Sequence, residues 1–351
     1  HGNFQVHYEE KTAGRGGIDM LIITRDFDNN IKDGVESTAL LACVSSLGKS
    51  KKTLALQMSP KSSYTILNVT NGRFTKQSIH DIYSFEDNGL DSLLMNAESN
   101  TVTEETMNDT VSPILDNNKL DVMKQSDYPK ILDVFSESSI QNILNYLTNS
   151  KNRLYDHVYI YLPLDDTELY KIVEPYADTE ILFVPQKPVN IDKYMTPKTF
   201  VVLKDYEPES KFDLQYLKKQ LKTKRIYTIP WNVGYRDAII SEDLLSFVHK
   251  NRKDMKGDDN FTFISSVTNL VSTFVLGKEQ IEGKIKEENF RKHHLDTIVQ
   301  AEGQEPEKTD DLPENAIQQV KVTKRKFFRK VETDEIMINL KHNDIQMDTE
   351  E

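Results

Sequence analysis

The chain has 351 residues and a formal net charge of -12, with 44 Lys and Arg against 56 Asp and Glu. Hydrophobic residues make up 37% and charged residues 28%, which is typical of a globular protein and excludes wholesale disorder. The lack of a run of about 20 apolar residues argues against a membrane-embedded protein. The acidic balance argues against nucleic-acid binding by the whole chain. The single cysteine, Cys43, excludes an internal disulfide and indicates a reducing, cytoplasmic compartment.

The first predicted elements form a βαβ unit. Residues 1–19 carry no apolar run, and we expect them to be a leader or an extension ahead of a domain that begins at Met20. The apolar run Met20–Thr24 predicts a buried strand, the helical spacing of apolar residues in Val35–Leu47 predicts a helix, and Thr53–Met58 predicts a second strand. Two strands joined by one helix favour a parallel pair with a right-handed crossover. Ligands of such sheets bind at the carboxyl ends of the strands, which directs attention to residues 25–38.

The same alternation continues to about Lys250. Predicted strands cover 155–163, 179–184, 199–203 and 225–229, and predicted helices cover 136–149, 168–176, 214–221 and 244–250. Residues 96–118 are rich in Asn, Asp, Glu and Thr and are predicted to form a surface excursion. Together these elements predict an α/β, doubly wound, mostly parallel sheet in which 20–24 and 155–162 are central strands.

The C-terminal region has a different composition. We expect an α/β domain at 20–255, a C-terminal helix at 256–282, and a polar tail at 283–351 that acts as a flexible tether. The tail contains the basic segment Lys324–Lys330, which includes two phenylalanines. This segment has three interpretations: a solvated turn, a contact with anionic lipid or a protein partner, and, least favoured because of its acidic flanks, a nucleic-acid contact.

A family resemblance enters at the start of the first predicted helix. Residues 32–38 read Lys-Asp-Gly-Val-Glu-Ser-Thr and resemble the deviant Walker A motif of the MinD/ParA family of P-loop ATPases, normally Lys-Gly-Gly-x-Gly-Lys-[Thr/Ser]. Lys32 falls on the signature lysine, Gly34 on the second glycine, and Thr38 on the magnesium-binding hydroxyl, while Asp33 replaces the first glycine. The resemblance implies a P-loop NTPase-like fold with ATP and Mg²⁺ as its cofactor.

Three further segments resemble the family in the expected order, at 154–163, 176–184 and 229–238. The last contains Pro230 and Asn232, which match the Pro-x-Asn loop that packs on the nucleobase in the family, and it is similar to the divergent TadZ/CpaE branch linked to pilus and secretion assembly. The resemblance therefore implies a nucleotide site made of a set of six residues: Lys32, Asp33, Gly34, Thr38, Pro230 and Asn232.

Three departures from the motif predict a degenerate site. Glu36 replaces the third glycine, Ser37 replaces the lysine that contacts the β- and γ-phosphates, and Tyr161 stands where the switch aspartate is expected. A carboxylate about 5 Å from a phosphate charge at an effective dielectric near 20 repels it by about 3 kcal/mol. ATP is therefore expected to bind weakly or not at all and to be hydrolysed very slowly or not at all. Arg25 is the candidate replacement for the missing positive charge.

Two functions remain open. One is a degenerate MinD/ParA-like protein that organises a protein assembly such as a pilus, secretion or conjugation apparatus, as a homodimer or an adaptor, in the cytoplasm or peripherally at the membrane. The other is an active partition or positioning ATPase. Ordinary structural roles compete with both: Lys32, Asp33 and Thr38 suit a helix start, Asn232 suits a turn, and Cys43 suits core packing.

Overall fold

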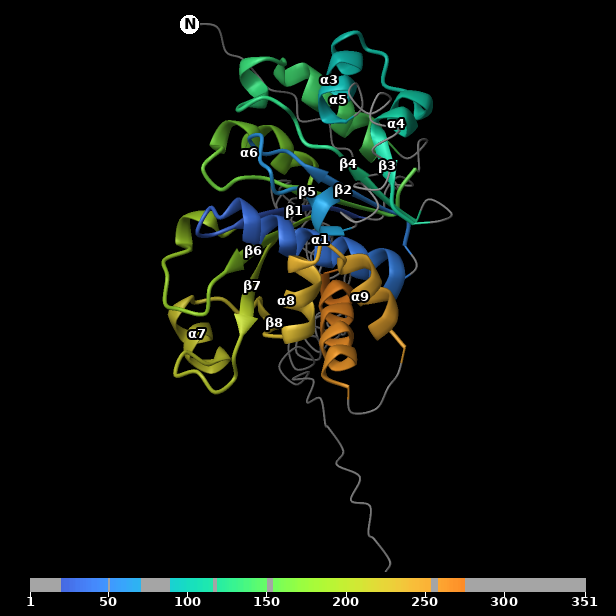
Figure 1. The fold of residues 1–351 in the computed structure, drawn as a ribbon. Helices are drawn as coiled ribbons and strands as arrows, with labels where there is room; N and C mark the ends of the chain where they lie inside the picture. The colour runs from blue at the N-terminus through green and yellow to red at the C-terminus, as the bar shows by residue number, and fades with distance from the viewer. Residues whose placement is uncertain are drawn as a thin grey trace, which may run out of the picture. The chain divides into compact units, whose positions relative to one another are not determined.

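The computed structural model describes residues 20–49, 51–70, 89–115, 119–149, 154–253 and 258–274. An eight-stranded sheet passes through them in the order β3-β4-β2-β5-β1-β6-β7-β8 (Figure 1). The strands are β1 Met20–Asp26, β2 Thr53–Gln57, β3 Val111–Pro113, β4 Leu120–Met123, β5 His157–Tyr161, β6 Thr179–Val184, β7 Thr199–Tyr206 and β8 Ile226–Pro230. All neighbouring pairs are parallel except β3 and β4. The mostly parallel α/β fold predicted from the sequence is confirmed.

The two strands predicted to be central lie side by side in the middle of the sheet. β1 pairs with β5 on one side and with β6 on the other, with Ile22 opposite Tyr159 in the first pair. Their uninterrupted apolar sequences reflect burial on both faces, because helices cover both sides of a sheet built from crossover connections.

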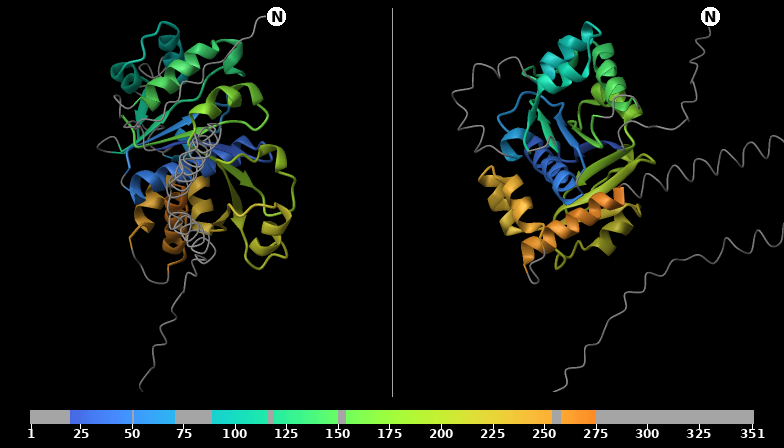
Figure 2. Two further views of the ribbon diagram at one scale, coloured as in Figure 1. Left: turned by 180° about the vertical axis from the view of Figure 1, so that it is seen from behind. Right: turned by 90° about the vertical axis from the view of Figure 1, so that its right-hand side faces the viewer.

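Helices cover both faces of the sheet (Figures 1 and 2). They are α1 Ile31–Gly48, α3 Leu90–Glu98, α4 Glu104–Thr110, α5 Glu137–Thr148, α6 Thr167–Val173, α7 Leu214–Gln220, α8 Val233–Ile240 and α9 Leu244–Asn251, with further helical residues at 66–70 and 259–274. Ile22 faces the core that is shared with α1, α8, α9 and 259–274, whereas Leu21 and Ile23 face α3, α5 and α6. The alternation along β1 therefore divides the interior into two layers.

Helix α1 is buried along most of its length, from Gly34 to Leu47. It lies between the sheet and the outer helices, and it contacts α9 directly. Cys43 is fully buried in it, and burial raises the pKa of the Cys43 thiol to about 12. The prediction that Cys43 serves packing agrees with this position.

The segment 96–118, expected to be a surface excursion, is largely exposed over its described residues, but it contains more regular structure than its composition indicated. The segment holds the end of α3, all of α4 and the edge strand β3. Helix α4 has only two turns and buries Met107 and Thr110, so its apolar pattern was too sparse to reveal a helix. A capping box formed by Thr103 and Thr106 begins it.

Some sequence-based expectations lie outside the described residues. These are the leader at 1–19, the tail at 283–351 and its basic segment Lys324–Lys330. Across the part of the chain that the structure describes, no helix combines the length and apolar character needed to cross a membrane.

Candidate functional site

The connection between β1 and α1 is much shorter than the sequence predicted. β1 continues to Asp26 and α1 already begins at Ile31, so only residues 27–30 link them. Lys32, Asp33 and Gly34, which were expected in a loop before the helix, lie in the first turn of α1. The helix starts early because Asn30 is an effective N-cap, in extended backbone conformation with its side chain turned to the helix.

The backbone N–H groups at this turn are satisfied from within the chain. Asn30 Oδ1 accepts hydrogen bonds from the backbone nitrogens of Lys32 at 3.1 Å and Asp33 at 3.5 Å. Asp26 Oδ1 accepts from those of Asp28 at 3.1 Å and Asn30 at 3.3 Å. Donors at a helix N-terminus are the groups that bind phosphate in P-loop proteins. Here the donors of Lys32 and Asp33 are paired with the side chain of Asn30, and Asp26 pairs with the amides of the loop before the helix.

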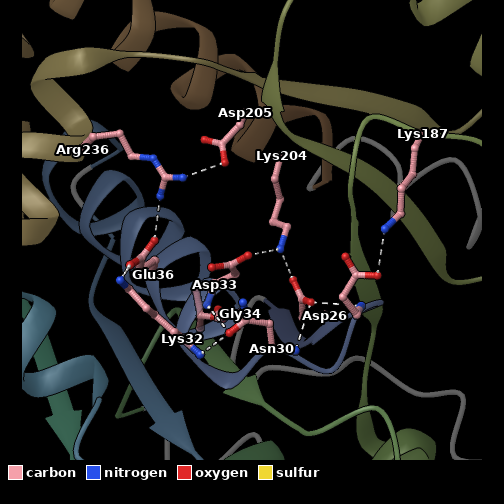
Figure 3. Close-up of polar contacts among 12 residues, drawn as sticks. Asp26, Asn30, Lys32, Asp33, Gly34, Glu36, Lys187, Lys204, Asp205 and Arg236 are labelled. Atoms are coloured by element: carbon pink, nitrogen blue, oxygen red, sulfur yellow. Dashed lines mark hydrogen bonds and ion pairs between the residues drawn. The ribbon is translucent and has the colours of Figure 1, made fainter. Parts of the chain in front are cut away.

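A buried lysine joins the end of β1 to the first turn of α1 (Figure 3). Lys204 Nζ, from β7, makes ion pairs with the carboxylates of Asp26 and Asp33, the latter at 2.9 Å. Burial alone would lower the pKa of Lys204, but the two carboxylates outweigh it and raise the pKa above its ordinary value. Lys204 is therefore a permanent positive charge at the carboxyl end of the sheet.

A second ion-pair cluster ties α1 to α8 (Figure 3). Arg236 on α8 donates to Glu36 Oε2 at 3.1 Å and to Asp205 Oδ2 at 3.0 Å. The Tyr64 hydroxyl donates to Glu36 Oε1 at 2.7 Å. Burial raises the pKa of Glu36, while Tyr64, Arg236 and Lys32 oppose that rise. The sequence-based expectation of an unbalanced negative charge at Glu36 needs correction, because Arg236 offsets it.

Little space is left between the two clusters. The cavity bounded by Asp33, Glu36, Lys204 and Arg236 offers about 10 Å³ to the centre of a water-sized sphere. That is room for about one water molecule. The side chains therefore leave no room for a nucleotide between α1 and the ends of β7 and β8 in this conformation.

Tyr161 occupies the other side of the first turn. Its ring lies so close to Gly34 that a Cβ atom there would be 2.3 Å from Tyr161 Cε2. The Tyr161 hydroxyl is buried and has no hydrogen-bond partner among the described residues. Thr38 is also fully buried, and its hydroxyl contacts the Gly34 carbonyl oxygen and Thr24 Oγ1, both at 2.7 Å.

The remaining predicted site residues lie at the end of β8 and the start of α8. Pro230 ends the strand. Asn232 caps α8, and its Oδ1 accepts from the backbone nitrogen of Tyr235 at 2.7 Å. Trp231 between them is 45% exposed, so it does not belong to the core. The structure links the two predicted parts of the site through Arg236, which reaches from α8 to Glu36 on α1.

Arg25 does not supply the missing positive charge, contrary to the expectation. It points to the opposite face of the sheet, where Nη1 pairs with Glu180 Oε1 at 3.0 Å and the guanidinium lies 4.1 Å from the ring centre of Tyr170. Side chains alternate between faces along a strand, and Arg25 shares its face with Ile23. Its ion pair is enclosed in the core.

Sequence reasoning missed four residues that build the site: Asp26, Asn30, Lys204 and Arg236. Asn30 carried a usable signal, because Asn directly before a helical segment is a common cap. Lys204 follows the buried strand segment 199–203 at the carboxyl end where sites form, which is a weaker signal. Nothing in the sequence paired Arg236 with Glu36, 200 residues away.

Comparison with known proteins gives no match to a family model and none to a curated protein. Among solved structures, the chain is similar to a ParA family ATPase from Chlorobium tepidum, with a TM-score of 0.54 and 11% sequence identity over 72% of this chain and 98% of that one. The protein has the fold of a ParA family ATPase.

Two further structures with this ParA-type fold are similar to the chain. One is the MinC:MinD cell division protein complex of Aquifex aeolicus, with a TM-score of 0.47 and 13% identity over 75% of this chain and 96% of that one. The other is a plasmid partition protein of Borrelia burgdorferi bound to AMPPNP, with a TM-score of 0.48 and 18% identity over 74% and 99%. At such low identity, the comparison with the ParA family ATPase establishes a common fold.

Proposed function

We propose that the protein is a degenerate MinD/ParA-like protein, nearest the TadZ/CpaE branch, that organises or localises a partner assembly such as a pilus, secretion or conjugation apparatus without hydrolysing ATP. The observation that supports this most strongly is the first turn of α1. Asn30 accepts from the N–H donors of Lys32 and Asp33 in this turn, Asp26 accepts from those of the preceding loop, and Lys204 is held by Asp26 and Asp33.

The side chains around the turn do not suit a nucleoside triphosphate. Asp26, Asp33 and Glu36 bring three carboxylates to the place where phosphates would lie, and their counter-charges are already engaged. The Thr38 hydroxyl, the group that would bind magnesium, is buried and hydrogen-bonded to backbone and to Thr24. Binding ATP would require both ion-pair clusters to open, which would leave the buried carboxylates of Asp26 and Glu36 without their cations.

Calorimetric titration of the full chain with ATP and Mg²⁺ tests this proposal. We expect no saturable binding up to ligand concentrations of about 1 mM, which corresponds to a binding free energy weaker than about -4 kcal/mol. The Lys32→Ala variant is the informative comparison, because Lys32 is the match to the signature lysine and its side chain is 58% exposed. Lys218→Ala on α7 is the matched control for loss of an exposed lysine.

The alternative, an active partition ATPase, predicts the opposite outcome. Saturable binding, together with magnesium-dependent phosphate release that is lost in Lys32→Ala and kept in Lys218→Ala, would overturn the proposal. The alternative is tested because the chain shares its fold with a ParA family ATPase.

The proposed role also assigns a task to the tail. We expect residues 283–351 to tether the domain to its partner assembly or to a membrane. A chain lacking 283–351 should keep the circular dichroism of the folded domain and lose its localisation in cells. Normal localisation of the shortened chain would remove the tether from the proposal, and loss of the folded signal would make the tail part of the fold.

A further inference from the structure

Helix α8 presents an apolar stripe to solvent. Val233 is 63% exposed and Ile240 is 79% exposed, and the adjoining Trp231 is 45% exposed. Val233 and Ile240 are seven residues apart, or two helical turns and about 10 Å, and therefore lie on the same face of the helix. We call Trp231, Val233 and Ile240 the α8 patch.

The opposite face of α8 is already used by the core. Tyr235, Ala238 and Ile239 are buried, and Tyr235 stacks on Phe263 with ring centres 5.1 Å apart. The α8 patch therefore cannot turn inward without breaking this packing. Three of the six large apolar side chains that are exposed among the described residues lie within 231–240, and such a concentration is typical of an interaction surface.

Acidic residues surround the α8 patch. Asp237 is exposed on the same stripe, between Val233 and Ile240. Glu207 adjoins Trp231, because the Trp231 backbone nitrogen donates to the carbonyl oxygen of the neighbouring Tyr206 at 3.1 Å. A second acidic pair, Asp258 and Asp259, directly precedes Asn260, whose side chain lies against Gly234 at the start of α8.

Arg236, a cation that lies beside the α8 patch, is paired with carboxylates of the protein itself. Arg236 lies 5.2 Å from the Trp231 ring centre, and both ends of its guanidinium are engaged by Glu36 and Asp205. Its charge is therefore committed to Glu36 and Asp205, whereas Asp237 is an exposed carboxylate on the same helical face as Val233 and Ile240.

We propose that the α8 patch binds an amphipathic helix of a protein partner, with apolar side chains at positions i, i+3 or i+4, and i+7 that cover the patch and flanking Lys or Arg side chains that pair with the acidic rim. Complementary charge selects this occupant. A second copy laid antiparallel on the stripe would bring two Asp237 carboxylates together, and an anionic membrane would face the acidic rim. The inference rests on the proposed function, because it specifies the chemistry of the protein partner that this function requires.

Trp231 provides a direct readout, because it is the single tryptophan of the chain. The probes are two synthetic helical peptides of equal length with Leu at i, i+3 and i+7, one with Lys and one with Glu at the flanking positions. We expect the Lys peptide to give a saturable blue shift of the Trp231 emission, with at least tenfold weaker binding for the Glu peptide.

Substitutions localise the binding. Asp237→Lys should weaken binding of the Lys peptide at least tenfold, and Ile240→Asp should do the same. Met95→Asp on α3, a residue 55% exposed, is the matched control for loss of an exposed apolar side chain and should leave binding unchanged. Because all three side chains are exposed, the urea midpoints of these variants should stay at the wild-type value.

Four outcomes would overturn the proposal: no saturable shift, equal binding of both peptides, a shift on dilution of the protein alone, which assigns the patch to a second copy, or a shift with anionic vesicles in place of peptide. The readout is independent of the nucleotide titration. If the peptides do not bind and ATP does not bind either, the proposal of a degenerate site is kept and only the α8 patch is rejected. If ATP binds and the Lys peptide also binds, only the proposed function is overturned.

Discussion

Tyr161 at the end of β5 and Gly34 in the first turn of α1 are in close contact at the candidate site. Tyr161 packs its ring against Gly34, and its buried hydroxyl has no hydrogen-bond partner in the part of the chain that the structure describes. A buried hydroxyl without a hydrogen bond costs about 1–3 kcal/mol. The arrangement therefore sacrifices some stability at the place where the family resemblance expects a carboxylate.

Removal of that hydroxyl should be stabilising or neutral. We expect Tyr161→Phe to raise the free energy of unfolding by up to about 1 kcal/mol, because it deletes an unpaired polar atom and keeps the ring. Tyr159→Phe is the control on the same strand, since the Tyr159 hydroxyl is 2.6 Å from Ser45 Oγ, and it should lower the free energy of unfolding by about 1 kcal/mol. Urea denaturation measures both, and a loss for Tyr161→Phe as large as that for Tyr159→Phe would contradict the prediction.

A methyl group at Gly34 tests the packing of the Tyr161 ring. Helix propensity alone favours Gly34→Ala by about 1 kcal/mol. The clash with Tyr161 should reverse the sign and cost about 1–3 kcal/mol. A double variant with Tyr161→Leu should recover most of the loss, as judged from urea midpoints. Gly48→Ala, whose Cβ would meet its nearest atom at 3.2 Å, is the control at the other end of α1, and equal losses at both glycines would contradict the prediction.

At the scale of elements, two ion-pair clusters fix α1 to the strand ends and to α8. Each joins segments far apart in the chain, β7 to α1 through Lys204 and α8 to α1 through Arg236. Buried ion pairs contribute little net stability when intact, but removal of one partner leaves an uncompensated charge. The clusters therefore determine the position of α1 more than they strengthen it.

Substitution of the buried lysine should be severe. Lys204→Met leaves the carboxylates of Asp26 and Asp33 without their cation, and we expect the free energy of unfolding to fall by about 3–5 kcal/mol. Lys187→Met removes the exposed ion pair with Asp28, 3.5 Å long, and should cost no more than about 1 kcal/mol. Urea denaturation measures the loss of unfolding free energy in both variants, and similar losses would show that Lys204 is not a buried charge that neutralises Asp26 and Asp33.

The pH dependence of stability should reveal the burial of Glu36. Its pKa is raised in the folded protein above the ordinary value of 4.5, so between these two values the folded state binds more protons than the unfolded state. The contribution of Glu36 to the free energy of unfolding therefore grows as pH falls through this window. Glu36→Gln lacks it, so the wild-type free energy minus that of the variant should increase as pH is lowered from 7 to about 5. A difference that shrinks on acidification would contradict this.

At the scale of the whole molecule, the sequence predicted the central part of the fold better than its edges. Continuous apolar runs identified β1, β5, β6 and β7, because strands buried on both faces need no polar alternation. The edge strand β3, three residues long, and the two-turn helix α4 bury too few apolar side chains to leave a periodic pattern.

The candidate site was predicted only in part. Motif spacing brought Lys32 to Thr38 to attention, but not the early start of α1, which depends on the cap at Asn30. Lys204 and Arg236 could not be found, because ion pairs between distant segments depend on strand order and side-chain direction, which a single sequence does not determine.

Hydrogen exchange should follow the order of strands in the sheet. Amides of Ile22–Thr24 in β1 and of Val158–Ile160 in β5 are paired within the centre of the sheet and should exchange only through global unfolding. Val111 in the edge strand β3 should exchange faster by at least about two orders of magnitude. Exchange measured by mass spectrometry checks this, and equal protection of β3 and β1 would contradict it.

The burial of Cys43 gives this protein a built-in chemical reporter. Thiol reagents attack the thiolate, and burial in α1 raises the pKa of the Cys43 thiol to about 12, so almost no thiolate exists in the folded state at neutral pH. The thiol becomes reactive only when α1 separates from the sheet and the outer helices. The alkylation rate of the wild-type chain therefore measures how often α1, the helix that begins at the candidate site, separates from the sheet.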